Sequence, residues 1–266
     1  MAQYQDHMLI LKSRPYREAD LLLTLFGIKS GKIGAVAKGA RRPKSRLAGI
    51  YPLSYAVCQI YHGRSNLDTL TAVDLVDGFP SLQKDLDKLS WAMFLADFVD
   101  EMFQERDANP AVVPWLIAAW ERLGVAPGSL SIALTASWHL LKLAGYTPKW
   151  DTCEICHKPP VPPTVVVDWE NDVLYCHEHS PASHRENNHY GHFGMEISFG
   201  TLRTWQQWMT LDVSKIGNYD AKGLIAEQLF ALFGRYVESH IGRMPRSLQF
   251  VREVENMVEK ERNKPL

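Results

Sequence analysis

Residues 21–39 read LLLTLFGIKSGKIGAVAKG, and this stretch decides the fold of the first part of the chain. Two apolar runs, residues 21–26 and residues 33–39, lie on either side of a short Lys-Ser-Gly-Lys turn. Apolar runs around such a turn are typical of a β-hairpin. Further strands are expected at residues 7–12, 53–61 and 67–73. About five short strands in so short a segment favour a small β-barrel, of the OB type or the SH3-like type.

The remainder of the chain has the apolar periodicity of helices. Helices are expected at residues 82–102, 112–123, 131–144, 199–209, 223–241 and 247–260. Most of the tryptophans fall in these segments, and we expect a helical core to contain Trp91, Trp115, Trp120, Trp138, Trp205 and Trp208. The predicted fold is therefore an α+β multidomain protein, with a small β-barrel over residues 1–80, a helical domain over 81–150 and 195–258, and a small zinc-ribbon-like insert over 151–194.

Charge is distributed unevenly along the chain, although the net charge is only −1. Residues 1–64 contain 11 Lys or Arg against 3 Asp or Glu, whereas residues 65–110 contain 3 basic and 10 acidic residues. Such segregation creates a positive field around the first segment that the total charge hides.

The most basic segment is residues 38–46, KGARRPKSR, with five basic residues and no acid in nine positions. Its Pro and Gly make a continuous helix or a central strand unfavourable, so we expect a loop between strands. A cationic loop beside a β surface suits contacts with phosphates, because each neutralised phosphate releases condensed counterions. A solvated loop without a partner is the alternative. Aromatic side chains that are candidates for base stacking lie in the same segment: Tyr16, Phe26, Tyr51, Tyr55 and Tyr61.

Two close pairs of metal-ligand residues lie in the insert. Cys153-x-x-Cys156 is followed, after 19 residues, by Cys176-x-x-His179. This spacing is typical of a structural zinc ribbon or knuckle, and residues 168–172 are expected to form the hairpin turn that brings the pairs together. Four protein ligands would close the coordination sphere, which indicates structure rather than catalysis. His157 and His177 are alternatives to His179, and a second group, His184, His189 and His192, reads as a surface loop.

No motif of a common enzyme class is present. The sequence has no phosphate-binding Gly-rich loop followed by Lys-Ser or Lys-Thr, no G-x-S-x-G and no H-E-x-x-H. It also has no run of 18 apolar residues that would span a membrane. We therefore expect a non-enzymatic cytoplasmic protein with reduced thiols.

Several motifs together resemble one known family. Residues 14–20 (RPYREAD), 31–33 (GKI) and 37–49 (AKGARRPKSRLAG) are similar to the N-terminal signature of RecO proteins, and residues 140–148 (LLKLAGYTP) and 245–248 (PRSL) continue the match. The resemblance implies an OB-fold N-terminal β-barrel over residues 1–80, followed by an α-helical domain with a zinc-binding insert. It also implies binding of single- and double-stranded DNA, strand annealing, and partnership with RecR, RecA and the acidic tail of single-stranded DNA-binding protein. It implies a nucleoid-associated location and a structural zinc ion. Many members have a fourth cysteine where this chain has His179.

Carried onto this sequence, the resemblance places the DNA contacts on Arg14, Arg17, Lys32, Lys38, Arg41, Arg42, Lys44 and Arg46. It places the acidic tail of the partner on the helical domain. Two other functions compete with this interpretation. One is an RNA-binding OB-fold processing factor, because stacking and phosphate contacts distinguish DNA from RNA poorly. The other is a metal-dependent nuclease that uses the central acids around Asp97 and Asp100.

Overall fold

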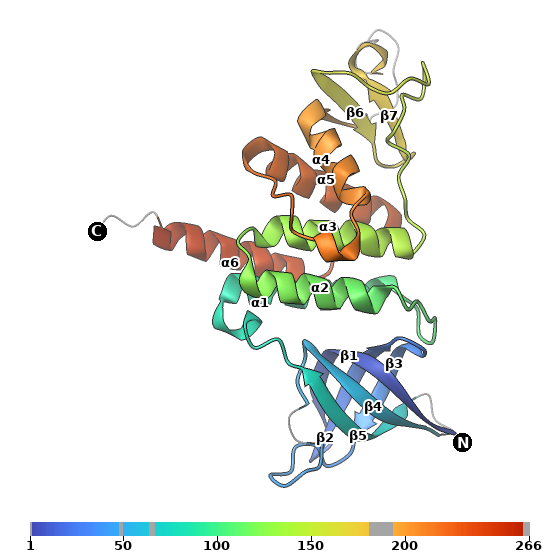
Figure 1. The fold of residues 1–266 in the computed structure, drawn as a ribbon, viewed down its shortest axis with the longest axis vertical. Helices are drawn as coiled ribbons and strands as arrows, with labels where there is room; N and C mark the ends of the chain where they lie inside the picture. The colour runs from blue at the N-terminus through green and yellow to red at the C-terminus, as the bar shows by residue number, and fades with distance from the viewer. Residues whose placement is uncertain (1, 48–49, 64–66, 181–193, 263–266) are drawn as a thin grey trace. The chain divides into compact units, whose positions relative to one another are not determined.

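The computed structural model describes residues 2–47, 50–63, 67–180 and 194–262 (Figure 1). Contacts within the chain divide it into two compact units. Residues 1–129 with 245–266 form one unit, and residues 130–244 form the other.

The first unit begins with a closed five-stranded barrel whose strand order is β1-β2-β3-β5-β4. The strands are β1 (Ala2–Tyr16), β2 (Asp20–Gly27), β3 (Gly31–Ala37), β4 (Ser54–His62) and β5 (Asp68–Asp77). The barrel closes because β1 pairs with both β2 and β4, and because β3 pairs with β5 in parallel. This is the arrangement of an OB-type barrel, so the predicted fold class is confirmed.

Strand β1 can pair with two neighbours because it is long and bends. Its pairing with β2 shifts register between Ile10 and Lys12, as at a β-bulge, which increases the local twist. Alternating side chains point inward, and Met8 and Ile10 lie in the barrel core with Leu23, Leu25, Ile33 and Cys58.

The predicted hairpin between β2 and β3 is confirmed. The buried Asp6 carboxylate accepts hydrogen bonds from the backbone N–H groups of Lys29 (3.0 Å) and Ser30 (2.9 Å), which fixes the turn. Gly31 follows with φ +64, and a Cβ there would lie 2.2 Å from the carbonyl oxygen of Asp107. The position therefore requires glycine.

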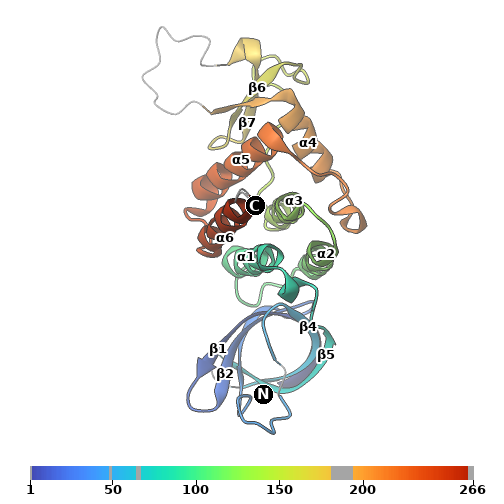
Figure 2. The same ribbon diagram turned by 90° about the vertical axis from the view of Figure 1, so that its left-hand side faces the viewer.

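Helices complete the first unit: α1 (Leu86–Met102), α2 (Val112–Val125) and α6 (Ser247–Arg262). Helix α1 begins at Asp85, whose carboxylate caps the first turn, and it packs against α2, α6 and strand β1 (Figure 2). The segment after α1 is also bound to the barrel. The N–H of Arg106 donates to the carbonyl oxygen of Lys32 over 2.8 Å, and the rings of Phe103 and Phe26 make an edge contact at 5.5 Å.

The second unit combines three helices with a three-stranded antiparallel sheet of order β7-β6-β8. The helices are α3 (Ser129–Leu143), α4 (Phe199–Met209) and α5 (Gly223–Ile241), and the strands are β6 (Thr164–Asp168), β7 (Val173–Cys176) and β8 (Met195–Ser198). All six predicted helices are present in the chain within a few residues of their expected ends. Strand β8 was not expected from the sequence.

An aromatic cluster fills the centre of the second unit. The rings of Trp150 and Trp205 lie 4.8 Å apart, and Trp138 contacts both of them as well as Tyr236. The six tryptophans expected in a helical core are all buried, as predicted. Among the described helices, none is long and apolar enough to cross a membrane.

Candidate nucleic-acid surface and metal centre

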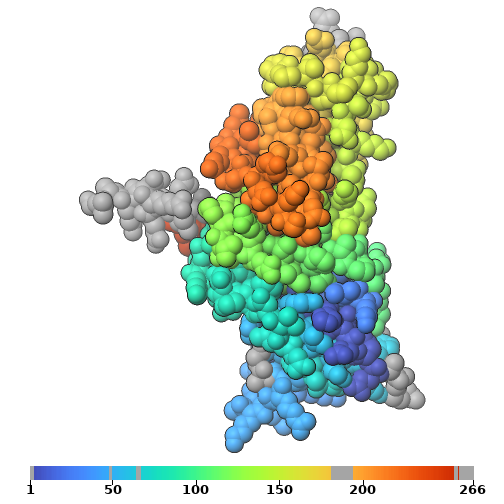
Figure 3. Space-filling model, viewed as in Figure 1, coloured from blue at the N-terminus to red at the C-terminus, as the bar shows by residue number. Residues whose placement is uncertain are grey.

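The basic loop, residues 38–46, is held to the barrel by hydrogen bonds at its start and by the buried Leu47 that follows it. The N–H of Gly39 donates to the Asp20 carboxylate over 2.8 Å, and the N–H of Arg41 donates to the carbonyl of Ala19 over 3.0 Å. Ala40 and Leu47 lie in the barrel core. Because these apolar side chains point inward, the charged side chains between them point into solvent, and Figure 3 shows the loop (light blue) projecting from the barrel.

Seven of the eight basic residues predicted to contact DNA have exposed side chains: Arg14, Arg17, Lys38, Arg41, Arg42, Lys44 and Arg46. They come from the end of β1, the turn after it and the basic loop. The guanidinium of Arg41 also donates to the backbone carbonyl of Glu18 over 3.4 Å, which links the loop to the β1–β2 turn. The structure therefore brings the two basic segments of the sequence to one region of the barrel surface.

Arg17 occupies a special backbone position in the β1–β2 turn. Its φ is +52, in the left-handed region, and its guanidinium lies 5.2 Å from the centre of the Tyr16 ring. Both residues line a hollow of about 450 Å³ together with Val36, Lys38 and Leu67. An aromatic face with two cations around it is a suitable surface for a base and its phosphate.

Lys32 differs from the other seven. Its side chain is only 15% exposed, and its ammonium lies 3.3 Å from the Asp100 carboxylate and donates to the backbone carbonyl of the same residue. These contacts attach β3 to α1. In this position the Lys32 ammonium is bound to helix α1, and it stabilises the first unit.

Lys12 is a basic residue of this surface that the sequence analysis did not select. Its ammonium lies 2.9 Å from Asp97 and 2.7 Å from Asp100. Burial lowers the pKa of Lys12, but the hydrogen bonds that its ammonium donates to the two carboxylates outweigh burial and leave the pKa raised, so the ammonium stays charged at neutral pH. Nothing in the local sequence pairs Lys12 with residues 85 or more positions later.

The aromatic candidates divide into two groups. Phe26 is fully buried under Phe103, so it belongs to the core. Tyr55 donates or accepts a hydrogen bond with His7 at 3.1 Å. Of the five, Tyr16 lies in a hollow together with exposed basic residues.

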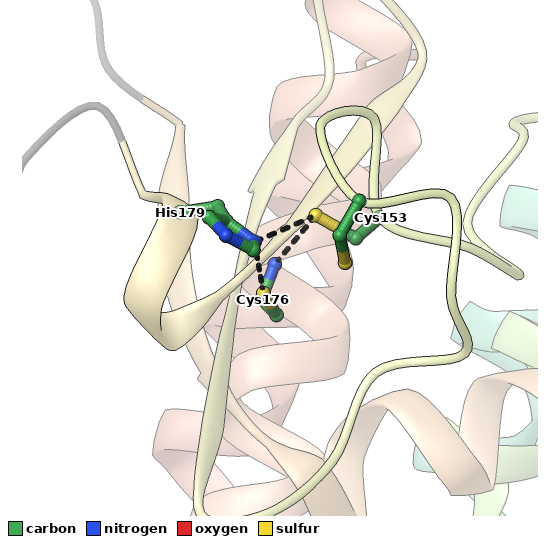
Figure 4. Close-up of side chains that lie close together, drawn as sticks. Cys153, Cys176 and His179 are labelled. Carbon is green, nitrogen blue, oxygen red and sulfur yellow. Dashed lines mark hydrogen bonds between the residues drawn. The ribbon is translucent and has the colours of Figure 1, made fainter.

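The four predicted metal ligands come together in the second unit (Figure 4). Cys153 and Cys156 lie in the loop before β6, Cys176 ends β7, and His179 ends the short 3-10 helix η2 (His177–His179). The ligand atoms of the four residues all lie within 4.8 Å of one another. The hairpin expected at residues 168–172 is present: the Asp168 carboxylate accepts from the N–H groups of Glu170 and Asn171, and β6 pairs with β7.

The thiols of this cluster are surrounded by hydrogen-bond donors. Burial raises the pKa of the Cys153 thiol, but backbone N–H groups of Cys156, Cys176 and Ile155, together with His179, outweigh burial and lower that pKa to about 6. Burial and the neighbouring Cys153 sulfur raise the pKa of Cys176. The hydrogen-bond donors around Cys153 therefore favour its thiolate, which is the form that binds a metal cation.

The donor set of three thiols and one imidazole fits a zinc ion. In a tetrahedral zinc site with ordinary bond lengths, neighbouring ligand atoms lie roughly 3.5–3.8 Å apart. The Cys153 Sγ and His179 Nδ1 atoms lie 3.7 Å apart, within this range, whereas the Cys176 Sγ and His179 Nδ1 atoms lie 2.9 Å apart, at the distance of a hydrogen bond. Among the described residues, the group that can hold a metal ion is Cys153, Cys156, Cys176 and His179.

The alternative histidines lie elsewhere or outside the described residues. His177 bonds Thr164 at 3.0 Å and faces Glu196, and His157 sits in a left-handed turn with φ +56. His184, His189 and His192 lie outside the described residues.

These features define a multidomain protein with an OB-type barrel, a helical region and a zinc-ribbon-like insert. Residues 1–79 match the family model "Recombination protein O N terminal", and residues 83–249 match "Recombination protein O C terminal". The chain therefore belongs to the RecO family of DNA repair and recombination proteins.

Individual relatives agree with this assignment. The DNA repair protein RecO of Heliobacterium modesticaldum is 38% identical over 160 residues, which are 60% of this chain and 58% of that protein. The proteins of the same name from Shouchella clausii and Moorella thermoacetica are 26% and 28% identical. Those two alignments cover 97% and 94% of this chain, and 96% and 91% of the relatives.

Proposed function

We propose that this chain is a recombination mediator. It binds single- and double-stranded DNA without reading sequence, anneals complementary strands and, with RecR, helps to load RecA onto DNA coated by single-stranded DNA-binding protein. The observation that carries the proposal is the group of seven exposed cations on one region of an OB-type barrel in a RecO-family chain.

The chemistry of annealing supports the same function. Two complementary strands repel each other through their phosphates, and a cationic surface lowers this repulsion as it releases counterions. The cations lie at the end of strand β1, in the turn after it and in a loop, rather than on a helix that enters a groove. Contacts from such elements reach phosphates and unstacked bases, and they position DNA without specifying its sequence.

The proposal assigns a role to each part of the chain. The barrel, residues 1–80, contacts nucleic acid. The helical domain, residues 81–150 and 195–258, receives the acidic tail of the single-stranded DNA-binding protein. The insert is formed by residues 151–194. Cys153, Cys156, Cys176 and His179 would hold a zinc ion that stabilises this insert. A cytoplasmic, nucleoid-associated location follows from binding chromosomal DNA.

The proposal excludes an enzymatic role for the central acids. Asp97 and Asp100 are paired with Lys12, and Asp100 is also paired with Lys32. Carboxylates that bind catalytic magnesium need oxygen atoms free to coordinate it, whereas these oxygens accept hydrogen bonds from lysines. We expect no magnesium-dependent cleavage, and any cleavage that survives Asp97→Ala with Asp100→Ala comes from another source.

The alternative is an RNA-binding OB-fold processing factor. The same hollow and the same cations suit RNA, because phosphates and π-faces are common to both nucleic acids. Affinities for DNA and RNA oligomers of matched sequence separate the two functions. A clear preference for RNA would favour the alternative.

The decisive experiment is the annealing of complementary oligonucleotides coated with the cognate single-stranded DNA-binding protein, without ATP, across a salt series. Acceleration that fades as salt rises supports a mediator acting through phosphate contacts. Intact binding without acceleration would contradict the annealing role and leave only a binding module.

A further inference from the structure

Two hollows that share Leu67 form a groove on the barrel beside helix α1. Its larger hollow, of about 600 Å³, is lined by Lys12 and Arg14 of β1, by Leu22 and Gly34 of the next two strands, and by Asp97 and Asp100 of α1. Leu67 lines this hollow and also the smaller one beside Tyr16 and Lys38. The two hollows therefore adjoin along one face of the barrel.

The two ends of the groove carry opposite charge. The end formed by the β1–β2 turn contains Arg17 and Lys38, both exposed, and the buried Asp68, whose carboxylate is paired with Arg106. The end formed by α1 contains Asp97, Asp100 and Glu105. Two basic residues also line that hollow: Lys12 is bound to two of these acids, and Arg14 is exposed. A polyanion in the groove is attracted at the first end and repelled at the second.

The acids are fixed in place relative to the barrel. Asp100 is bound to Lys32 of β3, and helix α1 packs against β1. After α1, Arg106 reaches across to the buried Asp68 of β5, over 3.1 Å. The carboxylates and Lys12 are each between 25% and 40% exposed, so they border the groove rather than lying beneath it.

We propose that Asp97 and Asp100 form an acidic stop at the α1 end of the groove, which withholds Lys12 from phosphates and confines a bound single strand to the Arg14–Lys38 end. This inference rests on the proposed function, because it specifies how the nucleic acid lies on the barrel. The strand then ends where the carboxylates begin, and Lys12 does not contribute to the counterions released.

The consequence is a difference in salt dependence. Each phosphate neutralised on a single strand adds about 0.7 to the slope of log affinity against log salt. With Asp97→Asn and Asp100→Asn together, Lys12 is free to neutralise a phosphate. We expect the slope to steepen by about 0.7. Over one decade of salt, from about 1 M down to about 0.1 M, this change in slope raises the affinity about fivefold.

The experiment measures binding of a fluorescent oligothymidylate to the full chain over a salt series. Four proteins carry the test: wild type, Asp97→Asn with Asp100→Asn, Lys12→Gln, and all three substitutions together. The inference predicts that Lys12→Gln changes nothing in the wild type and removes the whole gain in the double variant. A control pair, Asp74→Asn with Glu121→Gln, removes two exposed acids that line neither hollow and should leave the slope unchanged.

Two outcomes overturn the inference. One is a double variant whose slope equals that of the control pair, and the other is a Lys12→Gln protein whose slope is already lower than the wild-type slope. If the double variant does not unfold cooperatively, the slope of the Lys12→Gln protein alone still tests the inference. Failure of the proposed function looks different, since the wild type itself would then not bind the oligothymidylate.

Discussion

The guanidinium of Arg106 donates a hydrogen bond to the carboxylate of Asp68 over 3.1 Å, and the Asp68 side chain is fully buried. The same carboxylate oxygen lies 2.6 Å from Nδ1 of His62. Asp68 starts β5 and Arg106 follows α1, so the pair joins the barrel to the segment that leaves the helix. A buried carboxylate is tolerated only when hydrogen-bond donors or opposite charges are paired with it.

Replacing Arg106 by alanine should destabilise the chain by about 3 kcal/mol, because a buried carboxylate then keeps His62 as its one strong donor. The free energy of unfolding in urea measures this loss. Lys84→Ala, which removes an exposed cation from the same unit, is the matched control and should change the value by less than about 0.5 kcal/mol. Equal effects of the two substitutions would show that the Asp68 pair contributes little.

The sequence predicted most of the architecture because the relevant signals are local. Short apolar runs around turns identified the five strands of the barrel, and the 3.6-residue period identified the six helices. The Cys-x-x-Cys and Cys-x-x-His spacings identified four residues that lie together. Counting strands did not distinguish barrel types. The pairing of β1 with both β2 and β4, which closes the OB-type barrel, depends on contacts between distant residues.

The candidate surface was predictable only in part, for the same reason. The basic loop is a run of charge, so its exposed cations were visible in the sequence. Lys32 and Lys12 have the same charge, yet both are bound to acids of α1 that lie far along the chain. Charge patterns do not show which cations are paired after folding, and the acids of α1 read as a solvated helix face.

Arg41→Ala with Arg42→Ala should weaken binding of single-stranded DNA and flatten its salt dependence. Both side chains are exposed on the basic loop, so their loss removes up to two phosphate contacts and about 1.4 from the slope. Binding titrations between 0.05 and 0.3 M salt, roughly the range where such contacts dominate, provide the measurement. Lys215→Ala with Lys222→Ala, outside the barrel, is the control. A slope equal to that of the wild type would remove the loop from the binding surface.

The purified chain should contain about one zinc ion, and His179→Asn should lower the affinity for zinc at least tenfold. His177→Asn and His157→Asn are matched controls, since these residues neighbour the cluster in sequence but are not part of it. Elemental analysis after dialysis against a graded chelator gives the comparison. A larger loss in either control than in His179→Asn would assign the fourth ligand differently.

The stability of the second unit should depend on pH through His139 of α3. This side chain is buried, and its Nε2 atom lies 2.9 Å from the carbonyl oxygen of Trp208. Burial lowers its pKa, and the nearby Lys142 acts in the same direction, against the opposing hydrogen bond to Trp208. The unfolded chain, with an ordinary pKa near ~6.5, therefore takes up the proton first as pH falls.

The direction of the pH dependence follows from the lowered pKa of the folded state. The contribution of a neutral His139 is complete above the unfolded pKa, and it is lost as pH falls from there through the lowered folded pKa. Between about pH 7.5 and 5, the wild type should lose more unfolding free energy than His139→Gln, which keeps an N–H donor for Trp208 but does not titrate. The other histidines titrate alike in both proteins and cancel in the difference. Equal losses in urea denaturation at the two pH values would show that the proton affinity of His139 does not change on folding.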